Sequence, residues 1–396
     1  MSLLLDEPGL VKAHSIDHHY AAVMGLGTDN KGLRWLWVVV TGALLCGCGA
    51  EKPAELRAEL VLVDTIRLAE PDTLFLGEFL WIEVALQPFR LYVPDFRLGR
   101  VVVYDSSGRP VQVIGHRGEG PGALYPPYRV LLHEKFIYVL QQYGIISRFD
   151  RAGRFMDRLR FPEGYDPATL GFRLLDAGHL VVPSFSYAEP CSSVWEPVCA
   201  ETRVFSVVDT GLGRVTGRFG VYPQMYWEGN YAARAAEIDV QVDGGLAVAV
   251  YGLSSEVQFY AVSDTGGVLL RRVVLRHPAW RDPPQELPAR LAVENRARYN
   301  ELMRRASWMS RAYFVADTLV LAYFYNKKVD FYERPGWEDA AIAPYGVLVS
   351  TSGRWQQALE LPGPVLGRDA AYHLYIRLSD EPDRRLIGRY RVVLRQ

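Results

Sequence analysis

The chain is poor in cysteine, and its four cysteines fall in two pairs among 396 residues. Cys46 and Cys48 lie near the start, and Cys191 and Cys199 lie eight residues apart farther on. The second pair has no C-x-x-C spacing and no nearby histidine or third cysteine, so a zinc or redox centre is not indicated. In an oxidising compartment this pair predicts a disulfide between Cys191 and Cys199 that closes a small loop.

The chain has no excess of positive or negative charge, because the formal net charge is −1. Such a chain offers no overall basic field for nucleic acid, and no basic patch interleaved with aromatic residues occurs outside one arginine-rich segment. No Gly-x-Ser-x-Gly motif is present, and the glycine-rich stretch 115–122 lacks the Lys-Ser/Thr of a phosphate-binding loop. We therefore expect no nucleic-acid partner. The aromatic content of 12% suits a β-rich fold.

Long apolar runs are absent too, since the clearest one, Trp35–Leu45, has eleven residues and follows Lys31 and Arg34. A bilayer span needs about 20 residues, so this run predicts the apolar region of a secretory signal. It ends in Leu45-Cys46-Gly47-Cys48, which resembles a bacterial lipobox with Cys48 as the lipidated residue. The alternative is a plain signal peptide with incidental cysteines.

The start of the chain divides into short segments. Residues 1–23 are acidic and histidine-rich, unlike a signal peptide, so we expect Met24 as the true start and 1–47 as the signal region. Residues 48–55 form a polar tether after the lipidated cysteine. By analogy with lipoprotein sorting, the absence of Asp directly after Cys48 favours the outer membrane of the cell envelope.

One strand–turn–strand unit recurs through the remainder, residues 56–396. Within Leu91–Pro127, Arg100–Tyr104 and Val111–Ile114 flank the turn Asp105-Ser-Ser-Gly108. The turn pattern returns at Asp150–Gly153, Asp209–Gly213, Asp264–Gly267 and, with Ser in place of Asp, Ser350–Gly353. The irregular spacing excludes a solenoid of fixed period and favours propeller blades with loops of different length.

Further strands supply the rest of each blade. Four apolar segments between the hairpins predict the inner strands: Phe136–Leu140, His179–Val182, Leu246–Tyr251 and Thr318–Tyr325. The last blade, formed by Ala371–Leu378 and Leu386–Leu394, lacks one strand. Near the start of the chain, Leu60–Leu68 predicts a strand that belongs to none of the other blades. We predict an all-β, six-bladed propeller whose ring is closed by pairing of the N-terminal strand with the C-terminal blade.

One helical insert is expected at 285–310. Pro283-Pro284 precede Gln285–Met309, in which apolar and arginine positions recur with partly helical spacing. The segment is either a lid or partner-binding helix over one face, or an insert packed on the rim with solvated arginines. We favour the second interpretation.

The repeated pattern resembles a known family. The segments Arg100–Gly108 and Ile114–Gly122 are similar to NHL-repeat propellers, above all to uncharacterised six-bladed propeller lipoproteins of Bacteroidetes-type bacteria. The loop Gly118-Glu-Gly-Pro-Gly122 is the most specific piece. The resemblance implies the propeller fold and localisation to the cell envelope, and it implies no established activity.

Two loops contain candidate ligand-binding residues. In Gly115–Gly122 the glycines allow close backbone approach, and His116, Arg117 and Glu119 bring polar groups; the alternative is a connector between blades. Tyr226 and Trp227 lie in a polar stretch and are suited to stacking on a sugar or a peptide, unless they pack within the core.

Two functions follow from these features. The first is a lipid-anchored envelope module that binds a protein, peptide or glycan, with no cofactor. The alternative is a metal-dependent propeller hydrolase or lyase with axial calcium or zinc. Its ligands would come from five histidines scattered over different units: His116, His133, His179, His277 and His373. No two share an offset from their blade's turn.

The lipid anchor is testable with one substitution. A Cys48→Ala variant removes the thiol that would carry the lipid, so we expect it to move from the membrane fraction to the soluble fraction in cell fractionation. Retention in the membrane fraction would refute the anchor, and a Cys46→Ala variant should behave as the wild type.

Overall fold

The computed structural model describes most of one of the two units into which the chain divides, Leu56–Gln396. The described residues are 56–141, 144–159, 161, 163–167, 171–186, 191, 198–229, 231, 238–287, 290–333, 341–381 and 384–395. The predicted signal, lipidation site Cys48 and tether lie outside them. Among the described residues, no helix is long and apolar enough to cross a membrane.

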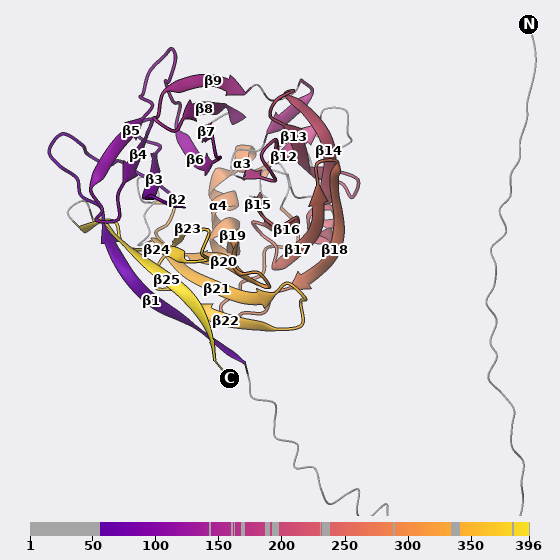
Figure 1. Ribbon diagram of the computed structural model, residues 1–396. Coiled ribbons are helices and arrows are strands. Elements are labelled where there is room, and N and C mark those ends of the chain that lie inside the picture. The colour runs from indigo at the N-terminus through magenta and orange to yellow at the C-terminus, as the bar shows by residue number, and fades with distance from the viewer. Residues whose placement is uncertain are drawn as a thin grey trace, which may run out of the picture. The chain divides into compact units, whose positions relative to one another are not determined.

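Six antiparallel sheets are arranged as blades around one axis (Figure 1). Blade 1 is β2 (Glu83–Leu86), β3 (Phe89–Asp95), β4 (Arg100–Tyr104) and β5 (Pro110–Ile114). Blade 2 is β6 (Pro127–Leu132), β7 (Phe136–Gln141), β8 (Ile146–Asp150) and β9 (Phe155–Leu159). Blade 3 is β10 (Tyr165–Pro167) and β11 (Arg173–Leu174), which both pair with β12 (His179–Ser186), then β13 (Arg203–Asp209) and β14 (Arg214–Val221).

The second half of the ring repeats this order. Blade 4 is β15 (Ile238–Asp243), β16 (Leu246–Tyr251), β17 (Glu256–Ser263) and β18 (Gly266–Val274). Blade 5 is β19 (Ser307–Ala316), β20 (Leu319–Lys327), β21 (Ile342–Ser350) and β22 (Gln356–Glu360). Blade 6 is β23 (Val365–Arg368), β24 (Leu374–Ser379), β25 (Leu386–Arg395) and β1 (Arg57–Arg67). The predicted six-bladed, all-β architecture is confirmed.

The N-terminal strand closes the ring as predicted. β1 pairs antiparallel with β25 from Arg57↔Arg395 to Arg67↔Leu386, around one bulge. Its start is also fixed to blade 5, because Ala58 N donates to Gln357 Oε1 at 2.7 Å and Gln357 Nε2 donates to Ala58 O at 2.8 Å. The sheet edge that the last three strands of the chain would expose is therefore paired.

The turn signature serves two purposes in the ring. Asp105 Oδ1 accepts hydrogen bonds from the backbone N–H groups of Ser107 and Arg109, which shapes the turn. Gly108 has φ +77°, and a Cβ there would lie 1.9 Å from the carbonyl oxygen of Arg67 on β1. The glycine therefore permits both the left-handed turn and close contact with the neighbouring blade.

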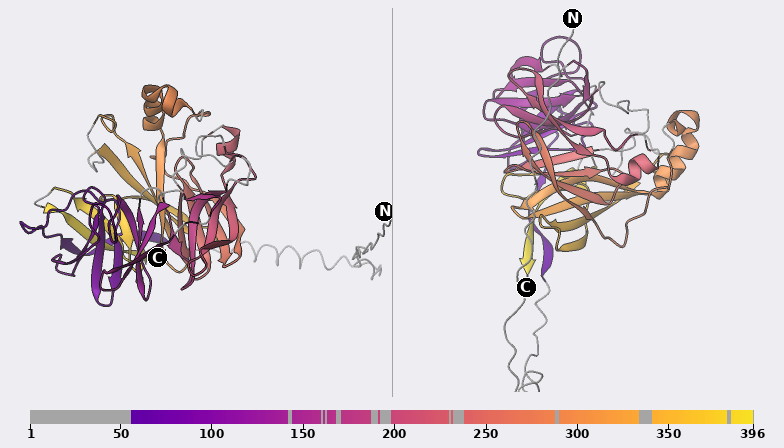
Figure 2. Two further views of the ribbon diagram at one scale, coloured as in Figure 1. Left: turned by 90° about the horizontal axis from the view of Figure 1, so that it is seen from above. Right: turned by 90° about the vertical axis from the view of Figure 1, so that its right-hand side faces the viewer.

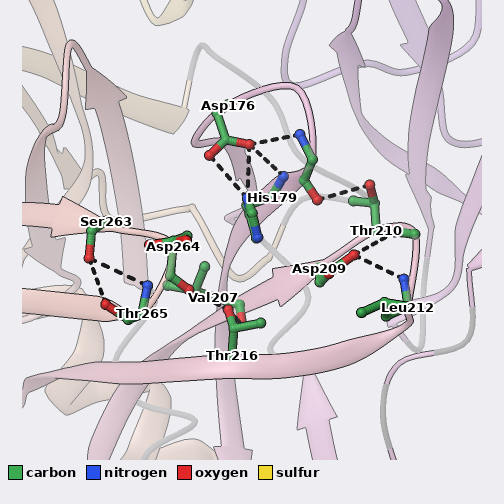
Figure 3. A network of polar contacts seen from close by, with 12 residues as sticks. Asp176, His179, Val207, Asp209, Thr210, Leu212, Thr216, Ser263, Asp264 and Thr265 are labelled. Carbon is green, nitrogen blue, oxygen red and sulfur yellow. Dashed lines mark hydrogen bonds and ion pairs between the residues drawn. The ribbon is translucent and has the colours of Figure 1, made fainter.

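Strand β14 of blade 3 contacts the β17–β18 turn of blade 4 (Figure 3). The Thr216 hydroxyl of β14 donates to the Asp264 carbonyl in the β17–β18 turn. Within blade 3, the Thr210 hydroxyl donates to the Gly178 carbonyl at 3.0 Å. These side-chain-to-backbone bonds satisfy turn groups that have no ladder partner.

The innermost strands differ from the prediction. The four segments predicted as inner strands are β7, β12, β16 and β20, which are second in their sheets. The strands nearest the axis are β2, β6, β10 with β11, β15, β19 and β23 (Figure 1). They were not identified because several are short and interrupted by charged residues.

The predicted helical insert is shorter and divided. It contains α3 (Leu291–Glu294) and α4 (Arg296–Arg305), while Ser307 already begins the innermost strand of blade 5. Asn295 ends the first helix and caps the second, because its side chain accepts a hydrogen bond from Arg298 N at 3.0 Å. The two helices stand on one face of the ring (Figure 2).

In Figures 1 and 2 the two helices stand over the central part of this face and not at its rim, so the favoured placement on the rim is not supported. Leu291, Tyr299 and Leu302 contact the hydrophobic core of the adjacent blades. Arg298 and Arg305 are solvent-exposed and form ion pairs with Glu301.

The turn glycines give a prediction for stability. Gly108→Ala should destabilise the fold by about 3 kcal/mol or more, because it combines a left-handed backbone with a clash against Arg67. Gly213 is the matched control: its φ is +61°, but nothing lies within 4 Å of a Cβ there. Gly213→Ala should cost only about 1–2 kcal/mol. Urea unfolding of both variants measures the difference, and equal midpoints would contradict the packing role.

Candidate functional site

A cavity of about 380 Å³ lies on the axis of the ring. Every blade contributes to it from its innermost strand or from the residue beside it. The charged or amide side chains among the lining residues are Glu83 (β2), Arg129 (β6), Arg151 (β8–β9 turn), Arg173 (β11), Gln241 (β15), Arg311 (β19), Arg368 (β23) and Asp369, which follows β23. This convergence of six blades makes the cavity the candidate functional site.

The cavity extends toward the face opposite the helices. Its lining includes Arg151 in the β8–β9 turn and Ala370 in the β23–β24 turn. α4 leads into the start of β19, whereas Ala370 follows the end of β23, so chain direction puts them on opposite faces. Ala370 is exposed and lies at the mouth.

One carboxylate is shared by several cavity side chains. Asp239 of β15 is 3% exposed, and its Oδ1 accepts a hydrogen bond at 2.8 Å from Nη2 of Arg129, which is 4% exposed. Nη2 of Arg173 lies 3.5 Å from the same oxygen, and Gln241 Nε2 donates to Asp239 Oδ2 at 3.1 Å. The buried charge of Asp239 is thus paired and hydrogen-bonded.

Arg311 is held differently. It is 4% exposed, and within the described part of the chain it forms no ion pair with a carboxylate. Its guanidinium carbon lies 4.1 Å from the ring centroid of Trp81, and that of Arg129 lies 5.5 Å from the same ring. Cation–π attraction therefore replaces part of the missing counter-charge.

The environment changes the ionisation of two cavity groups. Burial and, to a smaller extent, the neighbouring charge of Arg129 lower the pKa of Arg311 to about 10, so the group stays ionised at neutral pH. Burial raises the pKa of Glu83 to about 7, although the charges of Arg368 and Arg129 oppose the rise. The cavity therefore combines fixed positive charge with one carboxyl that titrates near neutrality.

The predicted loop Gly115–Gly122 lies away from this cavity. His116, Arg117 and Glu119 are exposed, and Arg117 and Glu119 border a second cavity of about 340 Å³ with Phe96, Arg97 and Tyr125. The loop folds back on itself, since Leu124 N donates to His116 O at 2.8 Å. It joins blade 1 to blade 2, as the connector alternative describes.

The expectation for Tyr226 is wrong. It belongs to α2 (Gln224–Glu228) and is fully buried, and its hydroxyl accepts a hydrogen bond from Leu253 N at 2.7 Å. The ring packs against Tyr222, Tyr231 and Tyr251, so the local polar sequence concealed an aromatic core. Trp227 is half-buried against the same core.

Cys191 and Cys199 form a disulfide with their Cα atoms 5.9 Å apart. The loop that it closes lies outside the described residues, apart from Val198.

The histidines have local partners. His179 Nδ1 lies 2.9 Å from Asp176 Oδ1, His373 Nδ1 lies 3.0 Å from Asp369 Oδ2, and His277 Nε2 lies 3.3 Å from the Leu359 carbonyl. Among the described residues, no group of three or more His, Cys, Asp or Glu is arranged to hold a metal ion.

The cavity residues were not identified from the sequence. A usable signal was present: Arg129, Arg173 and Arg311 each stand inside or beside a short apolar strand. An isolated arginine in such a strand is costly to bury alone, so it indicates polar groups or a ligand that reach it across the axis.

Comparison with known proteins supports the fold. No family model and no curated protein sequence matches the chain. A protein from Bacteroides fragilis described as exported has a similar structure, with TM-score 0.55 and 13% identity over 86% of this chain and 96% of that chain. A member of the duf4221 family from Bacteroides vulgatus has TM-score 0.59 and 10% identity over 85% and 98%. At such identities the likeness shows the fold alone.

Glu83 gives a pH-dependent prediction. The folded protein holds the Glu83 proton more tightly than the unfolded chain, where the pKa is about 4.5. Its stabilising contribution is therefore complete below about pH 4.5 and is lost as the pH rises to about 7. In the wild type, this loss should lower the free energy of unfolding by about 3 kcal/mol between those pH values, and the Glu83→Gln variant should not show this decrease.

Urea unfolding at a series of pH values measures this decline. Glu134→Gln, at an exposed glutamate, should keep the wild-type profile. Identical profiles for wild type and Glu83→Gln would refute the assignment.

Proposed function

We propose that this chain is an exported binding module of the cell envelope, whose axial cavity receives part of a protein, peptide or glycan ligand. The observation that carries the proposal is the convergence of the innermost strands of all six blades on one cavity. Propellers commonly place ligand sites on the axis, where strands of a rigid ring meet.

The size and the lining of the cavity suit recognition. A volume of about 380 Å³ lies in the range of small-molecule sites and matches one amino-acid side chain or one sugar unit. The lining strands belong to buried sheets, so the polar groups are held in place before a ligand arrives.

The envelope address rests on the sequence and on one structural relative. The apolar run Trp35–Leu45 and the lipobox-like Leu45–Cys48 support export and lipidation. The similar fold of an exported Bacteroides fragilis protein is consistent with this. We therefore propose a protein anchored to the outer membrane through Cys48, related to NHL-type propeller lipoproteins.

The axis favours binding over metal-dependent catalysis. Five arginines from four blades line it and repel a divalent cation, and Asp239 is already shared by two of them. A hydrolase or lyase with an axial metal would need carboxylate or imidazole ligands in place of these guanidinium groups.

The experiment blocks the opening of the cavity with a bulky substitution. Ala370→Trp places an indole on an exposed turn residue that borders the opening. The control, Ala297→Trp, adds the same bulk to an exposed position of α4 on the opposite face. Cross-linking of the anchored proteins in native envelopes, followed by mass spectrometry, identifies what each variant captures.

We expect a ligand that wild type and Ala297→Trp capture equally and that Ala370→Trp captures at least about tenfold less. One blocked contact of about 1.4 kcal/mol gives such a ratio. Equal capture by all three proteins would refute the axial cavity as the binding site.

A further inference from the structure

We propose that the axial cavity recognises an oxyanion, a carboxylate or phosphate group on its ligand, and that Arg311 and Arg129 are the residues that hold it. The inference deepens the proposed function, since it assumes that the ligand enters this cavity, and it names the chemistry that selects the ligand.

The first support is the balance of charge. Five arginines line the cavity together with the carboxyl groups of Glu83 and Asp369, while Asp239 pairs with Arg129 and Arg173, and Asp243 pairs with Arg368 at 3.0 Å. Among the described residues Arg311 has no carboxylate within ion-pair distance, and the charge of Asp239 acts on it from farther away, although Arg311 is 4% exposed and ionised. A buried guanidinium without a counter-ion is costly, and an incoming anion would remove that cost.

The second support is a pair of unused donors. The Nε–H groups of Arg311 and Arg129 are buried and have no hydrogen-bond partner among the described residues. Both side chains line the cavity, so an oxyanion inside it has two charged donors from different blades. Guanidinium groups bind carboxylate and phosphate with short, charge-assisted hydrogen bonds.

The third support is the way in which the donors are fixed. Trp81 lies under both guanidinium groups, with the Arg311 carbon 4.1 Å and the Arg129 carbon 5.5 Å from its ring centroid. The Arg129 fork is also held by its hydrogen bond to Asp239. Little side-chain entropy remains to be lost when the ligand binds.

Glu83 adds a dependence on pH. When protonated, its carboxyl group can donate a hydrogen bond to the oxyanion, and when ionised it repels the oxyanion. Because its pKa is about 7, binding should weaken as the pH rises through that value. The charged and titratable groups around the cavity come from every blade except that of Glu83 itself. They are Arg129 from β6, Arg151 from the β8–β9 turn, Arg173 from β11, Asp239 and Asp243 from β15, Arg311 and Tyr313 from β19, and Arg368 with Asp369 from β23 and its turn.

Calorimetry on the mature lipidated protein in detergent tests the inference. The probes are glucuronate, inorganic phosphate and, as the neutral counterpart of glucuronate, glucose. We expect glucuronate or phosphate to bind at pH 6 with up to about tenfold higher affinity than at pH 8, the limit for one carboxyl group with a pKa of about 7, and glucose not to bind. The probe that binds more tightly distinguishes a carboxylate from a phosphate source.

Two variants assign the residues. Arg311→Met removes the charge and keeps an apolar stem beside Trp81, so oxyanion affinity should fall about tenfold or more. Glu83→Gln should keep the pH 6 affinity at pH 8, and it tests the site independently if Arg311→Met fails to fold. Arg109→Met, at a side chain 76% exposed on a turn, should bind as the wild type.

Absence of oxyanion binding, equal binding of glucose, or unchanged affinity in Arg311→Met would each overturn the inference. A neutral ligand that Ala370→Trp excludes would overturn it and leave the proposed function standing. Oxyanion binding together with envelope capture that is insensitive to Ala370→Trp would overturn the function and leave the oxyanion site standing.

Discussion

Pairing between the two ends of the described chain is the interaction on which the rest of the structure depends. β1 and β25 form one ladder from Arg57↔Arg395 to Arg67↔Leu386, and this ladder turns six sheets into a ring. A ring has a centre, and the innermost strand of each sheet must face it (Figure 1). Side chains from distant parts of the sequence therefore meet on the axis without any loop to carry them there.

The packing of the ring explains how the fold tolerates a buried cluster of charged side chains. Arg129, Asp239 and Arg311 are almost fully buried, and such charges seldom stabilise a fold. Stability comes instead from the apolar layers between blades, where strands such as β16 and β20 are almost entirely buried. The cohesion of these layers offsets the cost of the charged axis, which leaves the axial side chains free to serve recognition.

Contacts between residues close in the sequence made the outer part of the fold predictable. The contacts at the axis join residues that are far apart in the sequence. The residues of each Asp-x-x-Gly turn form hydrogen bonds with one another, so the short motif is enough to predict the turn. The outer hairpins, the six blades and the closing strand could therefore be predicted from the sequence. Arg129 and Asp239 meet across 110 residues, and no short motif records that contact. The visible glycine-rich loop at 115–122 lies away from the axis, and Tyr226, in a polar stretch, proved to be core.

Stability and recognition are linked at Arg311. Its buried charge is stabilised by the ring of Trp81 and by the more distant charge of Asp239, with no carboxylate at ion-pair distance among the described residues, so burying it lowers the free energy of unfolding. A bound oxyanion would return that free energy, and the same anion would favour the protonated form of Glu83. Proton uptake and ligand binding would then reinforce one another by linkage. An apolar residue at position 311 would lower the cost of the empty state and remove the group that recognises the ligand, which is the usual conflict between stability and function.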